Sequence, residues 1–157
     1  MDKLVYRQAT VGIVIDNENN FLIVQMLDYK ENEWRFPGGG VKEGEEPQEA
    51  ILRELSEELG TKKFKILGTS KYRNQYDWPI EVILARLRKK GKTWRGQQQW
   101  HFLVRFTGSK EDIEPEKHEL RQVKWVKRAD LASHFVFPNQ WGFVDKVLQE
   151  LLPILGN

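Results

Sequence analysis

The chain has 157 residues, of which 31% are charged and 39% are apolar, a balance that predicts one globular domain over 1–157 and excludes a disordered protein. It contains no cysteine, which excludes disulfides, thiolate metal sites and a thiol nucleophile, and its net charge of +2 is too small to indicate a nucleic-acid binder by itself. The N-terminus lacks a signal-peptide pattern, and no apolar run approaches the roughly 18 residues that span a bilayer, so we expect a cytoplasmic protein without membrane contact.

The N-terminal part predicts a β-hairpin followed by a glycine-rich loop. Alternating apolar residues over 11–15, a turn over 17–20 and a second apolar run over 21–26 are typical of two antiparallel strands. The segment Pro37-Gly38-Gly39-Gly40 comes next, and its glycines can bring bare backbone close to a ligand. We therefore expect a loop there.

One helix has clear signals at both ends. Pro47 suits the first helical position and Gly60 supplies a stop, while between them apolar residues recur on one face: Ile51, Leu52, Leu55 and Leu59. The spacing predicts a helix from Pro47 to just before Gly60.

The second half of the chain predicts mostly strands. Aromatic and β-branched residues favour strands over 64–72, 80–87, 98–106 and 120–126, and a last helix is expected over about 139–152. The expected fold is therefore α+β, a mixed β-sheet sandwiched between two helices.

Six cationic residues crowd into ten positions in this half: Arg86, Arg88, Lys89, Lys90, Lys92 and Arg95. They suit the edge of a hairpin, which lysines protect from aggregation. The alternative is a patch that faces phosphate groups. The sequence leaves both interpretations open.

The predicted helix carries a cluster of acidic residues. At 100° per residue Glu54, Glu57 and Glu58 fall within one arc, where like charges destabilise a helix by about 0.2–0.5 kcal/mol per pair. A divalent cation would reverse that cost, and all-oxygen ligands suit magnesium or manganese together with substrate phosphates. The alternative is an ordinary solvated acidic face.

The glutamates belong to a longer pattern. Gly39 is followed after five residues by Glu45, and after seven more by Arg53-Glu54-Leu55-Ser56-Glu57-Glu58-Leu59-Gly60. This resembles the signature of the Nudix hydrolases, with Thr61 in place of the aliphatic residue at its end. The resemblance implies the Nudix fold and a hydrolase in which water attacks a phosphoanhydride bond of a nucleoside diphosphate derivative.

The resemblance also implies roles for individual residues. Magnesium, or manganese in its place, would be held by Gly39, Glu54, Glu57, Glu58 and Glu119. Arg53 would orient a neighbouring carboxylate, with Glu45 or Glu49 as its partner. Glu57 is one candidate for the catalytic base and Glu119 is preferred, with Glu114 and Glu116 as alternatives.

Further segments resemble a bacterial subgroup of RNA pyrophosphohydrolases and dinucleoside polyphosphate hydrolases. They are Tyr6-Arg7, the pair Tyr76 and Pro79, and Gly96-Gln97-Gln98-Gln99-Trp100. The substrate contacts expected from this resemblance are Arg7, Lys42, Tyr76, Gln98 and Phe143. Gly38, Leu27 and Asp28 depart from the subgroup pattern, which leaves Tyr29 or Lys30 to take over recognition of the base.

Other aromatic and histidine residues are less specific. Trp94, Trp100 and Trp141 join Phe143 as candidates for stacking on a nucleobase, although an aromatic side chain is more often part of a core. Among the three histidines only His118, beside Glu119, is kept as a candidate substrate contact.

The expected reaction is removal of pyrophosphate or phosphate from the 5′-triphosphate end of RNA, so RNA or a nucleotide is the expected partner. Diadenosine polyphosphates, nucleoside triphosphates and nucleotide sugars are alternative substrates. A nucleotide-sensing domain without catalysis is the alternative from another class. The sequence makes no prediction about oligomeric state.

Overall fold

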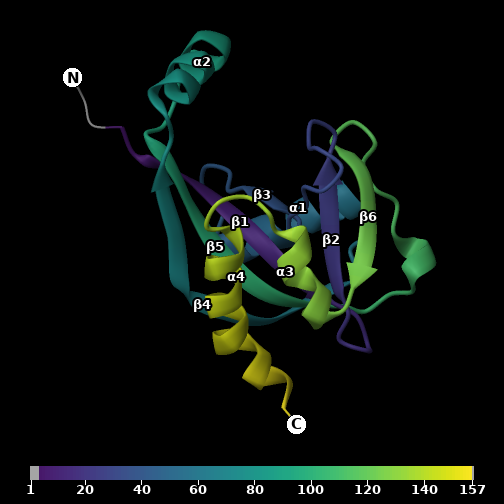
Figure 1. Ribbon diagram of the computed structural model, residues 1–157. Helices are drawn as coiled ribbons and strands as arrows, with labels where there is room; N and C mark the ends of the chain where they lie inside the picture. The colour runs from purple at the N-terminus through teal and green to yellow at the C-terminus, as the bar shows by residue number, and fades with distance from the viewer. Residues whose placement is uncertain (1–3, 157) are drawn as a thin grey trace.

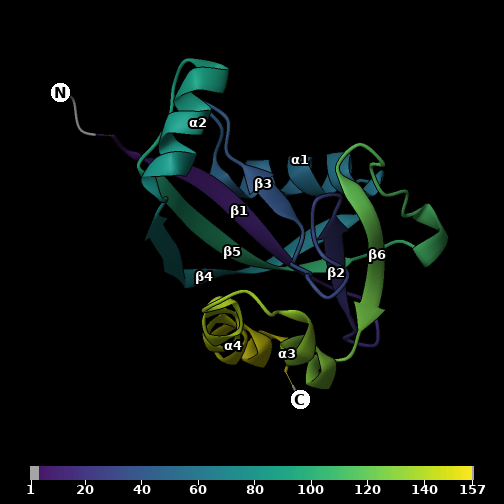
Figure 2. The ribbon, with the colours of Figure 1, turned by 45° about the horizontal axis from the view of Figure 1, so that its top comes forward.

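The computed structural model describes residues 4–156, in which a mixed six-stranded sheet lies between helices. Figures 1 and 2 show α1 on one face and α3 and α4 on the other, as expected for the predicted α+β class, while α2 lies away from both layers. The strands are β1 (Tyr6–Ile15), β2 (Phe21–Met26), β3 (Gly38–Gly40), β4 (Phe64–Asp77), β5 (Gly96–Phe106) and β6 (Leu120–Val126). The helices are α1 (Pro47–Leu59), α2 (Ile80–Lys90), α3 (Leu131–His134) and α4 (Gln140–Leu151).

The strands β1 and β2 are paired only next to the turn that joins them, so the sheet is split along the rest of their length. Its order is β4-β5-β1-β2-β6, with β1 parallel to β5 and antiparallel to β2. Ile15 at the end of β1 pairs with Phe21 of β2, whereas residues 9–11 of β1 pair with β3. A Cβ atom on Gly38 would lie 2.0 Å from the carbonyl oxygen of Thr10, so glycine is what lets this segment approach β1.

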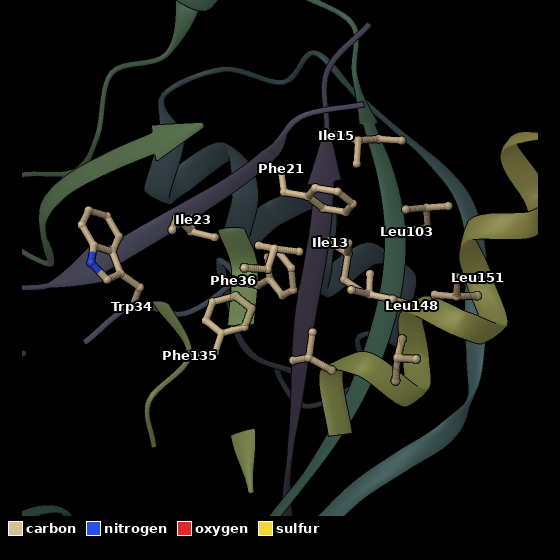
Figure 3. Close-up of a cluster of buried hydrophobic side chains, with 13 residues drawn as sticks. Ile13, Ile15, Phe21, Ile23, Trp34, Phe36, Leu103, Phe135, Leu148 and Leu151 are labelled. Carbon is tan, nitrogen blue, oxygen red and sulfur yellow. The ribbon is translucent and has the colours of Figure 1, made fainter. Parts of the chain in front are cut away.

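Two apolar layers hold the helices on the sheet. Alternate residues of β5 point to opposite faces, with Phe102 toward α1 and Leu103 toward α4. The layer under α3 and α4 is drawn in Figure 3 and includes Ile13, Ile15, Phe21, Ile23, Leu103, Phe135, Leu148 and Leu151. The layer under α1 includes Val14, Leu22, Val24, Ile51, Leu55, Leu59, Phe102 and Val104.

The prediction for α1 is confirmed at both ends. Pro47 is its first residue, and the backbone N–H of Glu46 donates to the carboxylate of Glu49 at 3.1 Å. Gly60 has a φ of 72°, and its N–H donates to the carbonyl of Ser56 at 2.9 Å.

The end of α1 also anchors a distant loop. The N–H groups of Glu114 and Glu116 donate to the carbonyls of Leu59 and Glu58, each at 2.8 Å. These bonds bring the segment before β6, with Glu119 at its end, beside the glutamates of α1.

The strand predicted over 80–87 is wrong, because this segment is the helix α2. Its apolar residues recur at helical spacing as Ile80, Ile83, Leu84 and Leu87, whereas a strand requires alternation. Gly91 ends the helix with a φ of 73°, and cationic residues in the last turn complement the helix dipole. The basic run therefore lies on α2 and the turn that follows, and the hairpin-edge interpretation is also wrong.

Other boundaries differ in smaller ways. The loop expected over 37–40 contains the short strand β3, β4 continues five residues beyond Tyr72, and β5 begins at Gly96. The expectation of two helices is wrong because α2 and α3 add to α1 and α4, whereas the strand predicted over 120–126 is confirmed as β6. None of the helices in residues 4–156 is long and apolar enough to cross a membrane.

Candidate active site

The glycine segment and α1 meet closely at one end of the sheet. A Cβ atom on Gly39 would lie 2.3 Å from the carboxyl carbon of Glu54, so glycine is required for this approach. The carbonyl of Gly39 accepts a hydrogen bond from the Thr10 hydroxyl at 3.0 Å, which ties the segment to β1. The backbone of Gly39 and the carboxylate of Glu54 therefore share one site.

Arg53 organises the acidic side of this site. Its Nε and Nη2 bind the two carboxylate oxygens of Glu45 at 2.8 and 3.0 Å, and Nη2 also donates to the carbonyl of Gly40 at 2.8 Å. Nη1 contacts Glu54 at 3.0 Å and Glu57 at 3.2 Å. Hydrogen bonds from Arg53 lower the pKa of Glu45 to about 2. Of the two partners expected for Arg53, the structure places Glu45 beside it.

Glu58 is a buried carboxylate with few hydrogen bonds or positive charges near it. Its side chain is 2% exposed, Arg35 Nη2 lies 3.5 Å from its Oε1, and its Oε2 has no hydrogen-bond partner among the described residues. Burial raises the pKa of Glu58 to about 8, and the nearby charges of Glu54 and Glu119 act in the same direction. An orphaned oxygen in this acidic setting is the environment that a divalent cation would stabilise.

Four of the five predicted metal ligands line one cavity of about 620 Å³: Gly39, Glu54, Glu58 and Glu119. The carboxylate of Glu57 is 56% exposed and is paired with Arg53. Within residues 4–156 no group of three or more acidic or histidine side chains could hold a metal ion as it stands. The donor set is all oxygen and fits a hard divalent cation, which would have to draw Glu54 and Glu57 away from Arg53.

The opposite side of the same cavity is basic. Arg7 lines it from β1, Arg86 from α2, and Arg35 from the segment between β2 and β3. Arg7 Nη1 donates to Gln97 at 2.6 Å, and Gln97 donates to the Tyr76 hydroxyl at 2.8 Å. Burial, and then the charge of Arg86, lower the pKa of Arg7. Cations held together in this way suit a polyanion such as a phosphate chain.

A second cavity, of about 660 Å³, adjoins the first through shared walls. Arg35, Gln97 and Gln99 line both cavities. The second is walled by planar side chains, among them Tyr29, Phe36, Tyr76, His101, Phe135, Phe137 and Phe143. The rings of Tyr29 and Phe137 meet edge to face at 5.1 Å, and His101 and Phe143 lie 5.0 Å apart. Planar walls with adjacent amides suit a nucleobase.

A buried amide holds the loop that carries Tyr29. Gln25 lies on β2 with no exposure, and its Nε2 donates to the carbonyls of Lys30, Glu31 and Glu33 at 2.8 to 3.2 Å. One side chain therefore shapes the turn after β2 and places Tyr29 in the second cavity.

The structure brings together some predicted substrate contacts and separates others. Arg7 lines the first cavity, Tyr76 and Phe143 line the second, and His118 lines the first. Lys42 and Gln98 line neither cavity in the described part of the chain, and Gln98 instead donates to Gln8 at 3.3 Å.

The side chains that the sequence interpretation missed are mainly Gln97 and Gln99. Alternation along β5 was the available signal, because residues 97, 99 and 101 share a face and 98 lies on the other. None of the three tryptophans proposed for stacking lines either cavity in residues 4–156. Trp100, for example, stacks under Arg73 at 3.5 Å and donates to Gln8 at 2.9 Å.

His101 should make stability depend on pH. Burial lowers its pKa to about 4, so the folded protein resists a proton that the unfolded chain accepts below about pH 6.5. The free energy of unfolding should therefore fall as pH decreases from 6.5 to 4. In His101→Phe that decrease should be smaller by about 1–3 kcal/mol, measured by urea denaturation. Equal slopes for the two proteins would contradict a buried neutral histidine.

Known proteins match the chain over most of its length. The NUDIX domain model matches residues 6–148. A protein of Rickettsia conorii called RNA pyrophosphohydrolase is 39% identical over 137 residues, which are 83% of this chain and 80% of the relative. A protein of the same name from Zymomonas mobilis is 37% identical over 141 residues, which are 87% of this chain and 88% of the relative.

Solved structures match more widely in shape than in sequence. The dihydroneopterin triphosphate pyrophosphohydrolase of E. coli has a TM-score of 0.69 at 17% identity, covering 94% of this chain and 98% of that one. A C. elegans Ap4A hydrolase in a binary complex has a TM-score of 0.65 at 17% identity, and the match covers 94% of this chain and 97% of that one. At these identities the likeness concerns the fold alone.

Proposed function

The chain belongs to the Nudix family of hydrolases, and from that membership we propose that it removes pyrophosphate or phosphate from the 5′-triphosphate end of RNA. The observation that supports this substrate class is the continuity of the two cavities. An acidic and arginine-lined space is joined through Arg35, Gln97 and Gln99 to an aromatic space. A nucleotide with a 5′ phosphate chain combines the same two kinds of group.

The proposed cofactor is magnesium, with manganese as a substitute. Glu54, Glu57, Glu58 and Glu119 would hold it together with the carbonyl of Gly39. A bound divalent cation would activate the attacking water and neutralise charge on the transferred phosphoryl group.

The other steps belong to the chain itself. Arg7, Arg35 and Arg86 bind phosphate oxygens and orient the phosphate chain. Glu119 accepts a proton from the attacking water. Arg53 keeps Glu45 and the carboxylates of α1 in position, while Tyr29 and Phe143 enclose the first base. Such a reaction on transcripts would take place in the cytoplasm.

The test is a comparison of rates in the presence of magnesium. The substrates are a short 5′-triphosphorylated RNA, diadenosine tetraphosphate, nucleoside triphosphates and a nucleotide sugar. The proposal expects the highest kcat/KM on the RNA, with pyrophosphate or phosphate as the product. A higher kcat/KM on a small nucleotide would overturn the RNA assignment and leave a nucleotide hydrolase with the same acidic site.

Replacing Phe143 tests the aromatic cavity as a base site. Phe143→Leu keeps an apolar side chain but removes the ring face, so kcat/KM on RNA should fall by roughly 5-fold to 150-fold, as for a loss of about 1–3 kcal/mol of stacking. Hydrolysis of inorganic tripolyphosphate, which has no base, should change less than twofold by our estimate. Equal losses on both substrates would place Phe143 in a structural role.

A further inference from the structure

α2 contributes little to the packed core. Every residue of this helix is at least partly exposed, and its apolar side includes Ile80 at 59%, Leu84 at 42% and Leu87 at 45% exposure. In Figures 1 and 2 the helix stands beside the start of β1, outside both helical layers. Core stability therefore does not explain why the chain builds this helix.

The base of α2 is nevertheless fixed to the sheet. The rings of Trp78 and Trp94 meet edge to face at 6.5 Å, and the Arg86 guanidinium lies 4.4 Å from the centre of the Trp78 ring. The N–H of Trp78 donates to the carbonyl of Arg95 at 2.9 Å, and Arg95 binds Asp77 at 3.0 Å. These contacts hold α2 at a defined place beside the first cavity.

The cationic residues of α2 lead away from that cavity. Arg86 lines it, and Lys90 lies one helical turn further along the same side, about 6 Å away along the axis. Lys89 lies on a neighbouring side of the last turn, whereas Arg88 lies nearly opposite Arg86. Lys92 follows Gly91 and lies 5.7 Å from the centre of the Trp94 ring. Positive charge thus extends from the phosphate-binding arginines to the tip of the helix.

We propose that α2 and the turn after it, residues 80–94, bind the RNA strand beyond its 5′ end. The cationic residues contact the backbone phosphates, and Trp94 with the apolar side of the helix contacts bases. This inference rests on the proposed function. An RNA whose triphosphate occupies the first cavity must leave it as a chain of negative charges, which the glutamates repel and α2 attracts. A free nucleotide reaches Arg86 but ends before the cationic residues beyond it, so the outer part of α2 selects RNA over free nucleotides.

A charge-neutral variant and a charge-retaining variant test the proposal. The first carries Arg88→Gln, Lys89→Gln, Lys90→Gln and Lys92→Gln, and the second carries Arg88→Lys, Lys89→Arg, Lys90→Arg and Lys92→Arg. Arg86 is left unchanged because it lines the cavity. Glutamine forms helices well, and circular dichroism checks that both variants keep their helix content.

Three measurements are compared between these proteins and the wild type. They are kcat/KM on a triphosphorylated RNA of about ten nucleotides, kcat/KM on a nucleoside triphosphate, and the affinity for the same RNA with a 5′-hydroxyl at several salt concentrations. The last measurement reports strand binding without any triphosphate.

The charge-neutral variant should lose roughly tenfold or more of kcat/KM on RNA and of RNA affinity. Its slope of log affinity against log salt should become shallower by about 0.7 for each lost phosphate contact. Its kcat/KM on the nucleoside triphosphate should stay within about twofold, and the charge-retaining variant should match the wild type on all substrates.

The outcomes distinguish failure of the proposed role of α2 from failure of the proposed function. If the wild type hydrolyses RNA and the charge-neutral variant equals it in rate, affinity and salt slope, α2 does not bind the strand while the proposed function stands. If the wild type hydrolyses nucleotides but not RNA, the proposed function fails and the role of α2 fails with it.

Discussion

Replacing Glu57 by glutamine should lower kcat by about 10³-fold without unfolding the protein. Glutamine keeps the size of the side chain and can still accept a hydrogen bond from Arg53, but it lacks the charge needed to hold a divalent cation. The charge stabilisation that such a cation supplies in the transition state is worth several kcal/mol, and about 4 kcal/mol corresponds to the expected loss. Because the Glu57 carboxylate is 56% exposed, the free energy of unfolding should change by about 0.5 kcal/mol or less. Steady-state kinetics in magnesium and urea denaturation measure the two effects.

Glu43→Gln is the matched control for that experiment. Glu43 is an exposed carboxylate within the same signature segment and lines neither cavity in the described residues, so the charge change is equal. Its kcat should remain close to that of the wild type. Substantial activity in Glu57→Gln would contradict the proposed metal site.

Replacing Glu58 by glutamine should remove activity and yet stabilise the metal-free protein. Burial raises the pKa of Glu58 to about 8. At a pH between about 4.5 and 8 the folded protein therefore keeps a proton that the unfolded chain releases, which costs free energy that grows with pH. A neutral amide avoids that cost. The metal-free variant should therefore be more stable than the wild type by about 1–3 kcal/mol at pH 8.

The dependence on pH and on magnesium distinguishes this effect from general stabilisation. The sign follows from the raised pKa: the advantage of Glu58→Gln should be small at pH 5 and grow toward pH 8. Denaturation in EDTA at both values measures it. Magnesium at about 100 times its Kd should stabilise the wild type by about 2.7 kcal/mol and the variant far less. An unchanged response to magnesium in Glu58→Gln would exclude Glu58 as a ligand.

Local signals made α1 predictable from the sequence, because the residues that start and stop it are its own neighbours. Pro47 and Gly60 act within one turn of the helix ends. The spacing of Glu54 and Glu58 on one arc is also a property of the helix alone. The Nudix resemblance rested on the signature from Gly39 to Gly60, and the α+β class followed from the order of predicted strands and helices.

One error came from a pattern that was interpreted with the wrong period. The β-branched residues over 80–87 favoured a strand, although the apolar spacing of α2 is helical. No residue of this helix is buried in the described part of the chain. In β5 the predicted contact Gln98 came from the subgroup resemblance, and neighbouring residues of a strand point to opposite faces. Gln97 and Gln99 face the cavities instead.

The sequence by itself determined the acidic helix, the glycine segment and most strands, because backbone propensity and apolar spacing act over a few residues. Only the tertiary structure decided which distant side chains meet. The opening between β1 and β2 admits the glycine segment to the sheet. Backbone hydrogen bonds from the loop before β6 to the carbonyls of α1 bring Glu119 to Glu58, and the contact with Trp78 places Arg86 beside Arg7. These contacts join residues up to 80 positions apart in the chain, and the packing of the whole sheet sets such distances.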